Sequence, residues 1–252
     1  MAYQEMARFY DKLMDTAPYT QWAEMTEEIL KNSSIPVKSI VDLGCGTGQL
    51  TTRLANSGYQ MIGIDFSSEM LSYAQQRASE KKQTIQWINQ DIRETEGIAE
   101  MDAVISYCDV MNYITSEEEL NLVFANVESM LKNNGLFIFD VHSLYHVENN
   151  LVNQTFATVE DDMSSIWFCS EGESKGEMYH DLTFFISGEQ ETYKRYDEYH
   201  HQKTFSIEFY KKLLEQNGLQ IRNIYGDFSM NEENLDEKAE RIFFITEKRS
   251  AK

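Results

Sequence analysis

The sequence predicts an α/β fold in which a mostly parallel sheet is covered by helices on both faces. Three observations support this prediction. Apolar runs typical of strands alternate with segments of helical spacing between residues 38 and 131. The first of these runs leads into three alternating glycines, and aspartates follow the next two. Because such alternation builds a parallel sheet whose ligands bind at the carboxyl ends of the strands, functional residues are expected there.

The pattern predicts the elements in chain order. The first thirty residues form two helical segments broken near Pro18. The repeating part then gives strand 38–43, helix 47–56, strand 59–65, helix 67–80, strand 84–89 and strand 101–107. Overlapping capping boxes at 115–119 begin a long helix that stops at 133–135. A fifth strand at 137–141, a helix at 206–217 and strands at 219–228 and 240–246 complete the prediction.

The alternation stops between residues 147 and 203. Aromatic or alternating runs there are separated by short turns that contain Gly, Ser and Glu, which predicts an antiparallel insert of three or four strands. Loops on a rigid scaffold are where specificity can be set. We therefore expect residues 147–203 to cover the substrate, residues 1–34 to form an N-terminal helical cover, and residues 35–146 with 204–252 to form the main domain.

Composition limits the possible partners. The chain has 42 acidic and 22 basic side chains and a formal charge of −20, so it repels nucleic acids and anionic membranes. Its three cysteines, Cys45, Cys108 and Cys169, show no pairing or zinc-binding spacing. The N-terminal residues lack a secretory pattern, and no run reaches the ~18 apolar residues of a membrane span. We expect a cytoplasmic protein that is a monomer or a homodimer.

The glycine-rich stretch can be compared with three known types of ligand-binding loop. Gln49 stands where a dinucleotide-binding G-x-G-x-x-G motif needs its third glycine, and the Gly-Lys-Ser/Thr of a phosphate loop is absent. Val41 to Gly48 instead resembles the glycine-rich loop of class I S-adenosylmethionine-dependent methyltransferases, apolar-apolar-Asp/Glu-apolar-Gly-x-Gly-x-Gly. That resemblance implies a Rossmann-like, seven-stranded sheet that the last two strands close as a hairpin.

Two aspartates strengthen the resemblance. Asp65 lies about 20 residues past the first glycine, where an acid can accept hydrogen bonds from ribose hydroxyls, although NAD-binding proteins also place an acid there. Asp91 matches the position that holds the adenine amino group in class I methyltransferases, and Ile92 offers the base an apolar wall. A lone aspartate after a strand is otherwise a helix cap.

The N-terminal residues extend the resemblance to a subgroup. Tyr3, Ala7, Tyr10 and Asp11 are similar to a Y-x-x-x-A-x-x-Y-D pattern in bacterial small-molecule methyltransferases, in which this segment lies over the cofactor. Tyr10 and Trp22 could equally be core residues, since aromatic side chains at helical spacing are usually buried. The predicted S-adenosylmethionine-binding residues are Gly44, Cys45, Gly46, Gly48, Asp65, Phe66, Met70, Asp91, Ile92, Tyr10 and Trp22.

The chemistry that the resemblance implies needs few special groups. Methyl transfer from a sulfonium is an in-line displacement, so alignment and exclusion of water matter most. His200, His201 and Tyr10 are the candidate catalytic residues, and His142 is a further possible base. Asp109 and Asn112 could suggest a metal-assisted reaction, but they lack diagnostic ligand spacing, and we predict no metal site.

These observations together predict an enzyme that transfers a methyl group from S-adenosylmethionine to a nitrogen or oxygen of a small molecule. Pro18 and Pro36 are the only prolines, so the Pro-containing loops of enzymes that methylate nucleic-acid bases are absent. Two alternatives stay open at this point. The chain could bind S-adenosylmethionine as a regulatory or interaction module without turnover, or it could be an NAD-dependent oxidoreductase.

Overall fold

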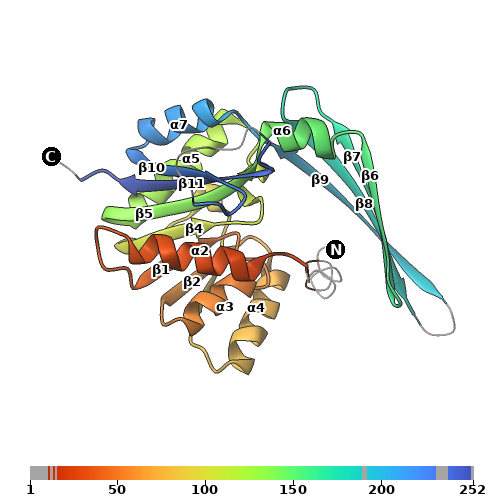
Figure 1. Cartoon of the computed structure of the whole chain (residues 1–252). Coiled ribbons are helices and arrows are strands. Elements are labelled where there is room, and N and C mark those ends of the chain that lie inside the picture. The colour runs from red at the N-terminus through yellow and green to blue at the C-terminus, as the bar shows by residue number, and fades with distance from the viewer. Residues whose placement is uncertain (1–10, 12–13, 15, 189–191, 231–237, 251–252) are drawn as a thin grey trace.

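The structure is a computed structural model that describes residues 11, 14, 16–188, 192–230 and 238–250. Two sheets, A and B, organise these residues (Figure 1). Sheet A lies between two layers of helices, and sheet B extends from it as a long arm.

Sheet A confirms the predicted mostly parallel sheet. Within the described residues it has seven strands in the order β10-β11-β5-β4-β1-β2-β3. Only β11 runs antiparallel to its neighbours β5 and β10. Chain order reverses between β1 and β4, which is where ligands bind in open α/β sheets. The strands are β1 (Ser39–Leu43), β2 (Gln60–Asp65), β3 (Gln86–Asn89), β4 (Met101–Ser106), β5 (Leu131–His142), β10 (Leu219–Gly226) and β11 (Arg241–Lys248).

Helices cover both faces of sheet A (Figure 1). One layer holds α2 (Tyr19–Lys31), α3 (Gln49–Asn56) and α4 (Ser68–Glu80), and the other holds α5 (Glu117–Met130) and α7 (Ile207–Gln216). Strand β5 shows why both layers form: Phe137 and Phe139 pack toward α5 and α7, whereas Leu136 and Ile138 pack on the side of α2 and α3. Among the helices of the described residues, none combines the length and apolar character that a membrane span requires.

Serine caps begin three of these helices. The hydroxyl oxygens of Ser67, Ser116 and Ser206 each accept a hydrogen bond from the backbone N–H three residues later, in α4, α5 and α7 respectively. The cap at Ser116 is the one that the capping boxes at 115–119 predicted. These caps fix where the loops after β2 and β4 end, and therefore where their side chains lie.

Strand β5 begins earlier than the sequence predicted. The Asn-Asn-Gly segment at 133–135 is the predicted stop of the helix, but α5 already ends at Met130, and Leu131 pairs with Met101 of β4. The register then shifts, so that the next pair is Leu136 with Ala103. The segment is thus a bulge within the strand, and Asn134 takes the positive φ of 64° that it requires.

Sheet B confirms the predicted antiparallel insert. It consists of β6 (Gln154–Val159), β7 (Met163–Glu171), β8 (Glu177–Ser187) and β9 (Tyr193–Lys203), paired in chain order. The short helix α6 (Leu144–His146) and a π-helical turn η3 (Val147–Leu151) join it to β5. Side chains alternate between its two faces, and we call the face that carries Trp167, His180 and His200 the inner face.

Candidate active site

The loop between β1 and α3 holds the three alternating glycines. Gly44, Gly46 and Gly48 all have positive φ angles, of 72°, 53° and 73°. The backbone N–H groups of Gly44 and Cys45 donate to the carbonyl of Ile64, at 2.8 and 3.0 Å, which ties the loop to the end of β2. Glycine is needed here because other residues rarely adopt this conformation.

The three glycines differ in what surrounds them. A Cβ at Gly44 would lie 2.5 Å from Val110, and one at Gly48 would lie 2.8 Å from Trp87, so both positions are closed by packing. A Cβ at Gly46 would meet no described atom within 4 Å. Gly46 therefore leaves open space beside its backbone, as a loop that a ligand approaches closely must do.

Asp65 ends β2 beside this loop. Its carboxylate accepts hydrogen bonds from the backbone N–H groups of Gly46 and Ser67, both at 2.9 Å. Burial raises the pKa of Asp65, while these N–H groups act in the opposite direction. Each carboxylate oxygen has a further lone pair, so the group can also accept hydrogen bonds from a ligand's hydroxyls.

Asp91 follows β3 and has two structural tasks. It caps the short helix η1 (Ile92–Glu94) by accepting a hydrogen bond from the Arg93 backbone N–H at 2.9 Å. It also pairs with the Arg93 guanidinium, at 3.0 Å from Nε and 2.6 Å from the second nitrogen. These hydrogen bonds lower the pKa of Asp91, so the carboxylate is ionised at neutral pH.

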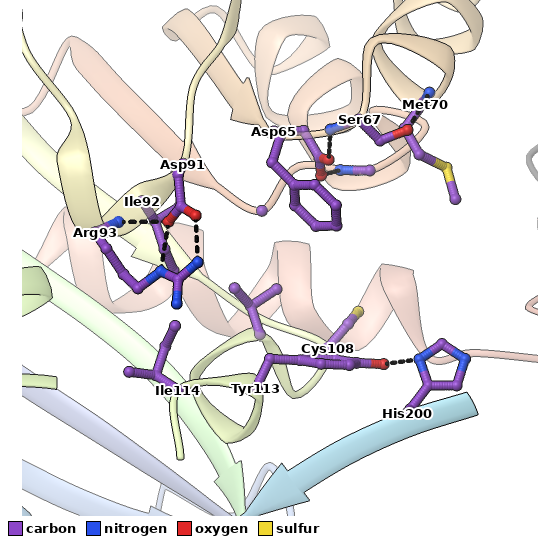
Figure 2. Close-up of a pocket in the computed structure, with 14 residues that line it drawn as sticks. Asp65, Ser67, Met70, Asp91, Ile92, Arg93, Cys108, Tyr113, Ile114 and His200 are labelled. Carbon is purple, nitrogen blue, oxygen red and sulfur yellow. Dashed lines mark hydrogen bonds and ion pairs between the residues drawn. The ribbon is translucent and has the colours of Figure 1, made fainter. Parts of the chain in front are cut away.

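A pocket of about 320 Å³ brings most of the predicted cofactor residues together, and we call it the glycine-loop pocket (Figure 2). Tyr113 and Ile114 lie across it from Asp65 and Asp91. The pocket opens where β1, β2 and β4 end, at the switch point of sheet A. Of the predicted residues, it is lined by Gly44, Gly46, Asp65, Phe66, Met70, Asp91 and Ile92.

Within the described residues, the other predicted cofactor residues do not line this pocket. Cys45 is buried and lines an adjoining small cavity of about 40 Å³, which shares Gly44, Gly46 and Cys108 with the glycine-loop pocket. Gly48 caps the start of α3. Trp22 is 2% exposed in the core, where its Nε1 donates to Asp140 at 2.8 Å. Tyr10 lies outside the described residues, as do Tyr3 and Ala7.

Asp11, the last residue of the N-terminal pattern, contacts the glycine loop. Its Oδ1 accepts hydrogen bonds from the Thr47 hydroxyl at 2.6 Å and the Gln49 amide at 3.2 Å. Its other oxygen pairs with Arg77 of α4. The chain that leads into α2 is therefore fastened to the same loop that borders the pocket.

Asp42 lies beneath the loop, in the middle of the matched motif. Its side chain is 4% exposed and accepts a hydrogen bond from the Thr51 hydroxyl at 2.6 Å. Burial is the main reason that the pKa of Asp42 is raised to about 7. The folded protein therefore keeps a proton on this carboxyl over a pH range in which an exposed aspartate has lost it.

We expect Asp42 to lower stability as pH rises from about 4 to about 7, because the folded state there holds a proton that the unfolded state has released. Asp42→Asn removes the titrating group but keeps an oxygen for Thr51. The unfolding free energy of the variant relative to wild type should therefore rise by a few kcal/mol across this window. Urea unfolding of both proteins at both ends of the window measures this change, and a difference independent of pH would contradict it.

A second pocket, of about 380 Å³, lies under the inner face of sheet B. We call it the sheet B pocket. Phe156 and Trp167 pack against each other in it, with ring centroids 4.6 Å apart and ring planes tilted by 33°, and Ser165 and Gln202 add polar groups. It adjoins the glycine-loop pocket, because three residues line both pockets: Cys108, Tyr113 and His200.

The neighbouring histidines of β9 point in opposite directions. His200 lies on the inner face and lines both pockets. His201 lies on the outer face, where it stacks on Tyr179 and pairs with Glu177 at 2.8 Å. Of these two predicted bases, the structure brings only His200 to the site.

His180 also faces the sheet B pocket, opposite His200 on β8. Trp167 Nε1 donates to its Nδ1 at 2.9 Å, and its Nε2 lies 3.1 Å from the Gln202 amide oxygen. Burial lowers the pKa of His180 to about 4. This imidazole is therefore neutral at pH 7, with both nitrogens occupied.

The residues considered for a metal are engaged with other groups. Asn112 is buried, donates to the Lys203 carbonyl and accepts from the His142 N–H. Asp109 pairs with His142 at 3.1 Å and with Arg241. Within the described residues, no group of three or more His, Cys, Asp or Glu side chains could hold a metal ion.

Arg241 stands at the centre of a buried charge network beside the sheet B pocket, which Asp109 and His142 line. It pairs with Asp109 and, at 3.0 Å, with Asp140, which is fully buried. Burial alone would raise the pKa of Asp109, but Arg241 and His142 hold it below its ordinary value. Cys108 and Asp109 both have positive φ angles, of 59° and 65°, so the network holds a strained turn where the two pockets meet.

Sequence reasoning missed Glu198. It lies two residues before His200, and therefore on the same face of β9, where its Oε2 is 3.0 Å from His200 Nε2. The Glu-x-His spacing within a predicted strand was the signal that could have revealed it. Tyr113 was harder to assign, because its contact with His200 joins residues 87 positions apart.

Comparisons with known proteins agree with this geometry. Residues 40–135 match a family described as a methyltransferase domain. A protein of Bacillus subtilis (strain 168), described as a putative methyltransferase, is 39% identical over 250 residues, covering 98% of each chain. A solved S-adenosylmethionine-dependent methyltransferase from Clostridium acetobutylicum is 27% identical, with a TM-score of 0.89, and the match covers 99% of this chain and 100% of that one.

A further solved structure holds S-adenosylmethionine. It is an amino pentose methyltransferase from Micromonospora echinaspora, 13% identical with a TM-score of 0.76, and the match covers 95% of this chain and 96% of that one. The family match, together with the Bacillus and Clostridium relatives, identifies S-adenosylmethionine as the cofactor. The chain therefore belongs to the class I S-adenosylmethionine-dependent methyltransferases.

Proposed function

We propose that this methyltransferase transfers the methyl group to a nitrogen or oxygen of a small molecule bound in the sheet B pocket. The observation that carries the proposal is the shared wall of the two pockets. Cys108, Tyr113 and His200 line both, so a cofactor in one and an acceptor in the other meet at these side chains. In this arrangement the chain acts mainly by aligning two reactants and excluding water.

The residues of the glycine-loop pocket fit the cofactor. The open space beside Gly46 admits the methionine part, and the Asp65 carboxylate accepts hydrogen bonds from the ribose hydroxyls. Asp91 is proposed to accept a hydrogen bond from the adenine amino group, while Ile92 and Met70 give the base apolar walls. When bound, S-adenosylmethionine supplies an electrophilic methyl group on a sulfonium.

The sheet B pocket suits a small acceptor with one flat or apolar face. Phe156 and Trp167 form an aromatic floor, and Ser165 and Gln202 can hydrogen-bond polar substituents. The Micromonospora relative is an amino pentose methyltransferase, which supports a small acceptor that carries an amine. The acidic charge of the chain disfavours nucleic acid as an acceptor.

On the acceptor side, His200 is the proposed base and His201 is not, because His201 lies on the outer face of sheet B. Trp22 is proposed to support the fold rather than to contact the cofactor, since it is buried against Asp140. The insert at 147–203 is the proposed acceptor cover and residues 1–34 the N-terminal cover on the main domain of 35–146 and 204–252. A cytoplasmic location and a monomeric or homodimeric state stay predictions.

The experiment uses S-adenosylmethionine with a deuterated methyl group. The protein is incubated with a bacterial extract from which ultrafiltration has removed the macromolecules, and products are identified by mass spectrometry. We expect one small molecule to gain the labelled methyl group while S-adenosylhomocysteine accumulates. Trp167→Ala should keep cofactor binding by calorimetry and lose most of the labelled product. Labelling of protein or nucleic acid in whole extract, and of no small molecule, would contradict the proposal.

A further inference from the structure

We propose that Tyr113, His200 and Glu198 form a proton relay in which Tyr113 contacts the acceptor and Glu198 positions His200. This inference rests on the proposed function, because it concerns the proton that a nitrogen or oxygen acceptor must lose. In this relay His200 does not contact the acceptor, but receives its proton through the Tyr113 hydroxyl.

Both ring nitrogens of His200 have a side-chain partner. The Tyr113 hydroxyl lies 3.1 Å from His200 Nδ1, and the dashed line in Figure 2 marks this contact. Glu198 Oε2 lies 3.0 Å from His200 Nε2. A carboxylate can only accept, so Nε2 carries the proton of the neutral imidazole. Nδ1 is then an acceptor, and the Tyr113 hydroxyl donates to it. With both ring nitrogens engaged, a proton from the acceptor reaches His200 by way of the tyrosine oxygen.

Tyr113 is placed to make that contact. It ends the short helix η2 (Val110–Tyr113), which follows β4 at the switch point of sheet A. Its side chain is 45% exposed and borders both pockets. The hydroxyl therefore stands on the path between the cofactor and the acceptor.

Glu198 gives His200 a buried negative partner. Its side chain is only 4% exposed, and within the described residues its Oε1 has no hydrogen-bond partner. A buried carboxylate without full pairing is costly unless a positive charge can form beside it. Protonation of His200 supplies that charge.

Of the ionisable groups near His200, His180 and Asp109 are already engaged with other partners, so Glu198 is the group that stabilises a protonated His200. His180 faces it from β8 and is neutral, with Trp167 and Gln202 on its nitrogens. Asp109 lines the same pocket but is paired with Arg241 and His142.

The proton that the acceptor loses during methyl transfer passes along the relay and finally to water. The acceptor nitrogen or oxygen forms a bond to the methyl carbon while the sulfur–carbon bond breaks, and the acceptor proton passes to the Tyr113 oxygen. The original hydroxyl proton of Tyr113 passes to His200 Nδ1. The resulting imidazolium is paired with Glu198 and returns the proton through Tyr113 to water after the methylated product leaves.

Kinetics with the acceptor from the labelled-methyl screen tests the relay. We expect Tyr113→Phe and Glu198→Gln each to lower kcat by about 100-fold, the lower end of the range for acid–base catalysis, with little change in acceptor KM or cofactor affinity. The double variant should be no slower than Tyr113→Phe, because the residues act as one unit. Tyr199→Phe and Glu177→Gln are matched controls on the outer face and should keep kcat.

Nitrogen-15 NMR of the histidine rings tests the same contacts without any acceptor. In the full chain with S-adenosylhomocysteine, His200 should carry its proton on Nε2, with His200→Gln used to assign its resonances. Tyr113→Phe should shift mainly Nδ1, and Glu198→Gln mainly Nε2. A proton on Nδ1, or resonances that neither variant changes, would overturn the relay.

The two proposals can fail separately. A labelled small molecule produced at the wild-type kcat by Tyr113→Phe defeats the relay and leaves the proposed function standing. Absence of any small-molecule acceptor defeats the proposed function, and the NMR result then decides whether the three side chains are linked.

Discussion

Arg241→Met should destabilise the protein by about 3–5 kcal/mol, the scale for removing one partner from a buried ion pair. The guanidinium lies between Asp109 and Asp140, and its carbon is 5.2 Å from the centre of the Trp22 ring. Methionine keeps most of the side-chain volume but leaves two carboxylates without their cation. Equilibrium unfolding in urea at neutral pH measures the loss.

Arg195→Met is the matched control for this variant. Arg195 also pairs with an aspartate, Asp197, but the pair lies on the surface of sheet B, where solvent screens it. The same substitution there should have a far smaller effect on the unfolding free energy. If the two variants lost equal stability, the burial of the Arg241 network would not be the cause.

Gly46→Val should weaken S-adenosylmethionine binding by two orders of magnitude or more, which corresponds to at least about 2.7 kcal/mol. A Cβ at this position projects into open space beside the glycine-loop pocket, so the branched side chain would occupy the place of the cofactor. It would also resist the φ of 53° that the loop uses. Isothermal titration calorimetry with S-adenosylmethionine gives the affinity directly.

Gly58→Val separates the two causes. Gly58 follows α3, has a φ of 98° and likewise has no described atom within 4 Å of an added Cβ, but it lies outside the pocket. Both variants carry the backbone strain of a positive φ, so both should lower the melting temperature. Only Gly46→Val should lose cofactor affinity, and an equal loss in both would mean that strain rather than occupied space is responsible.

Local signals explain why the sequence could predict sheet A and the meeting of the glycine loop with Asp65. The glycine spacing, the aspartates at 65 and 91 and the serine cap at 116 each lie within a few residues of the element they specify. Chain order then brings the carboxyl ends of neighbouring strands together. No knowledge of distant contacts was needed to place Asp65 beside Gly46.

The proposed acceptor side depends on contacts that local patterns do not contain. The pairing of Tyr113 with His200 requires the position of sheet B relative to η2, and that position depends on how β9 returns to the main domain. Trp22 is another example, because only its hydrogen bond to Asp140, 118 residues away, shows that it belongs to the buried network. Helical spacing placed Trp22 on an apolar stripe, but it could not show that Asp140 is its hydrogen-bond partner.

The alternation of side chains along β9 limits how the arm can change in length. Thr204 is fully buried at its base, and its hydroxyl donates to the His142 carbonyl, so this end of the strand is anchored. Deleting one residue between His200 and Thr204 would invert the parity of the strand and bring Tyr199 to the place of His200. Residues can be added at the distal turns without this effect. The arm can therefore change in length at its tip, whereas the number of residues between His200 and Thr204 has to stay fixed.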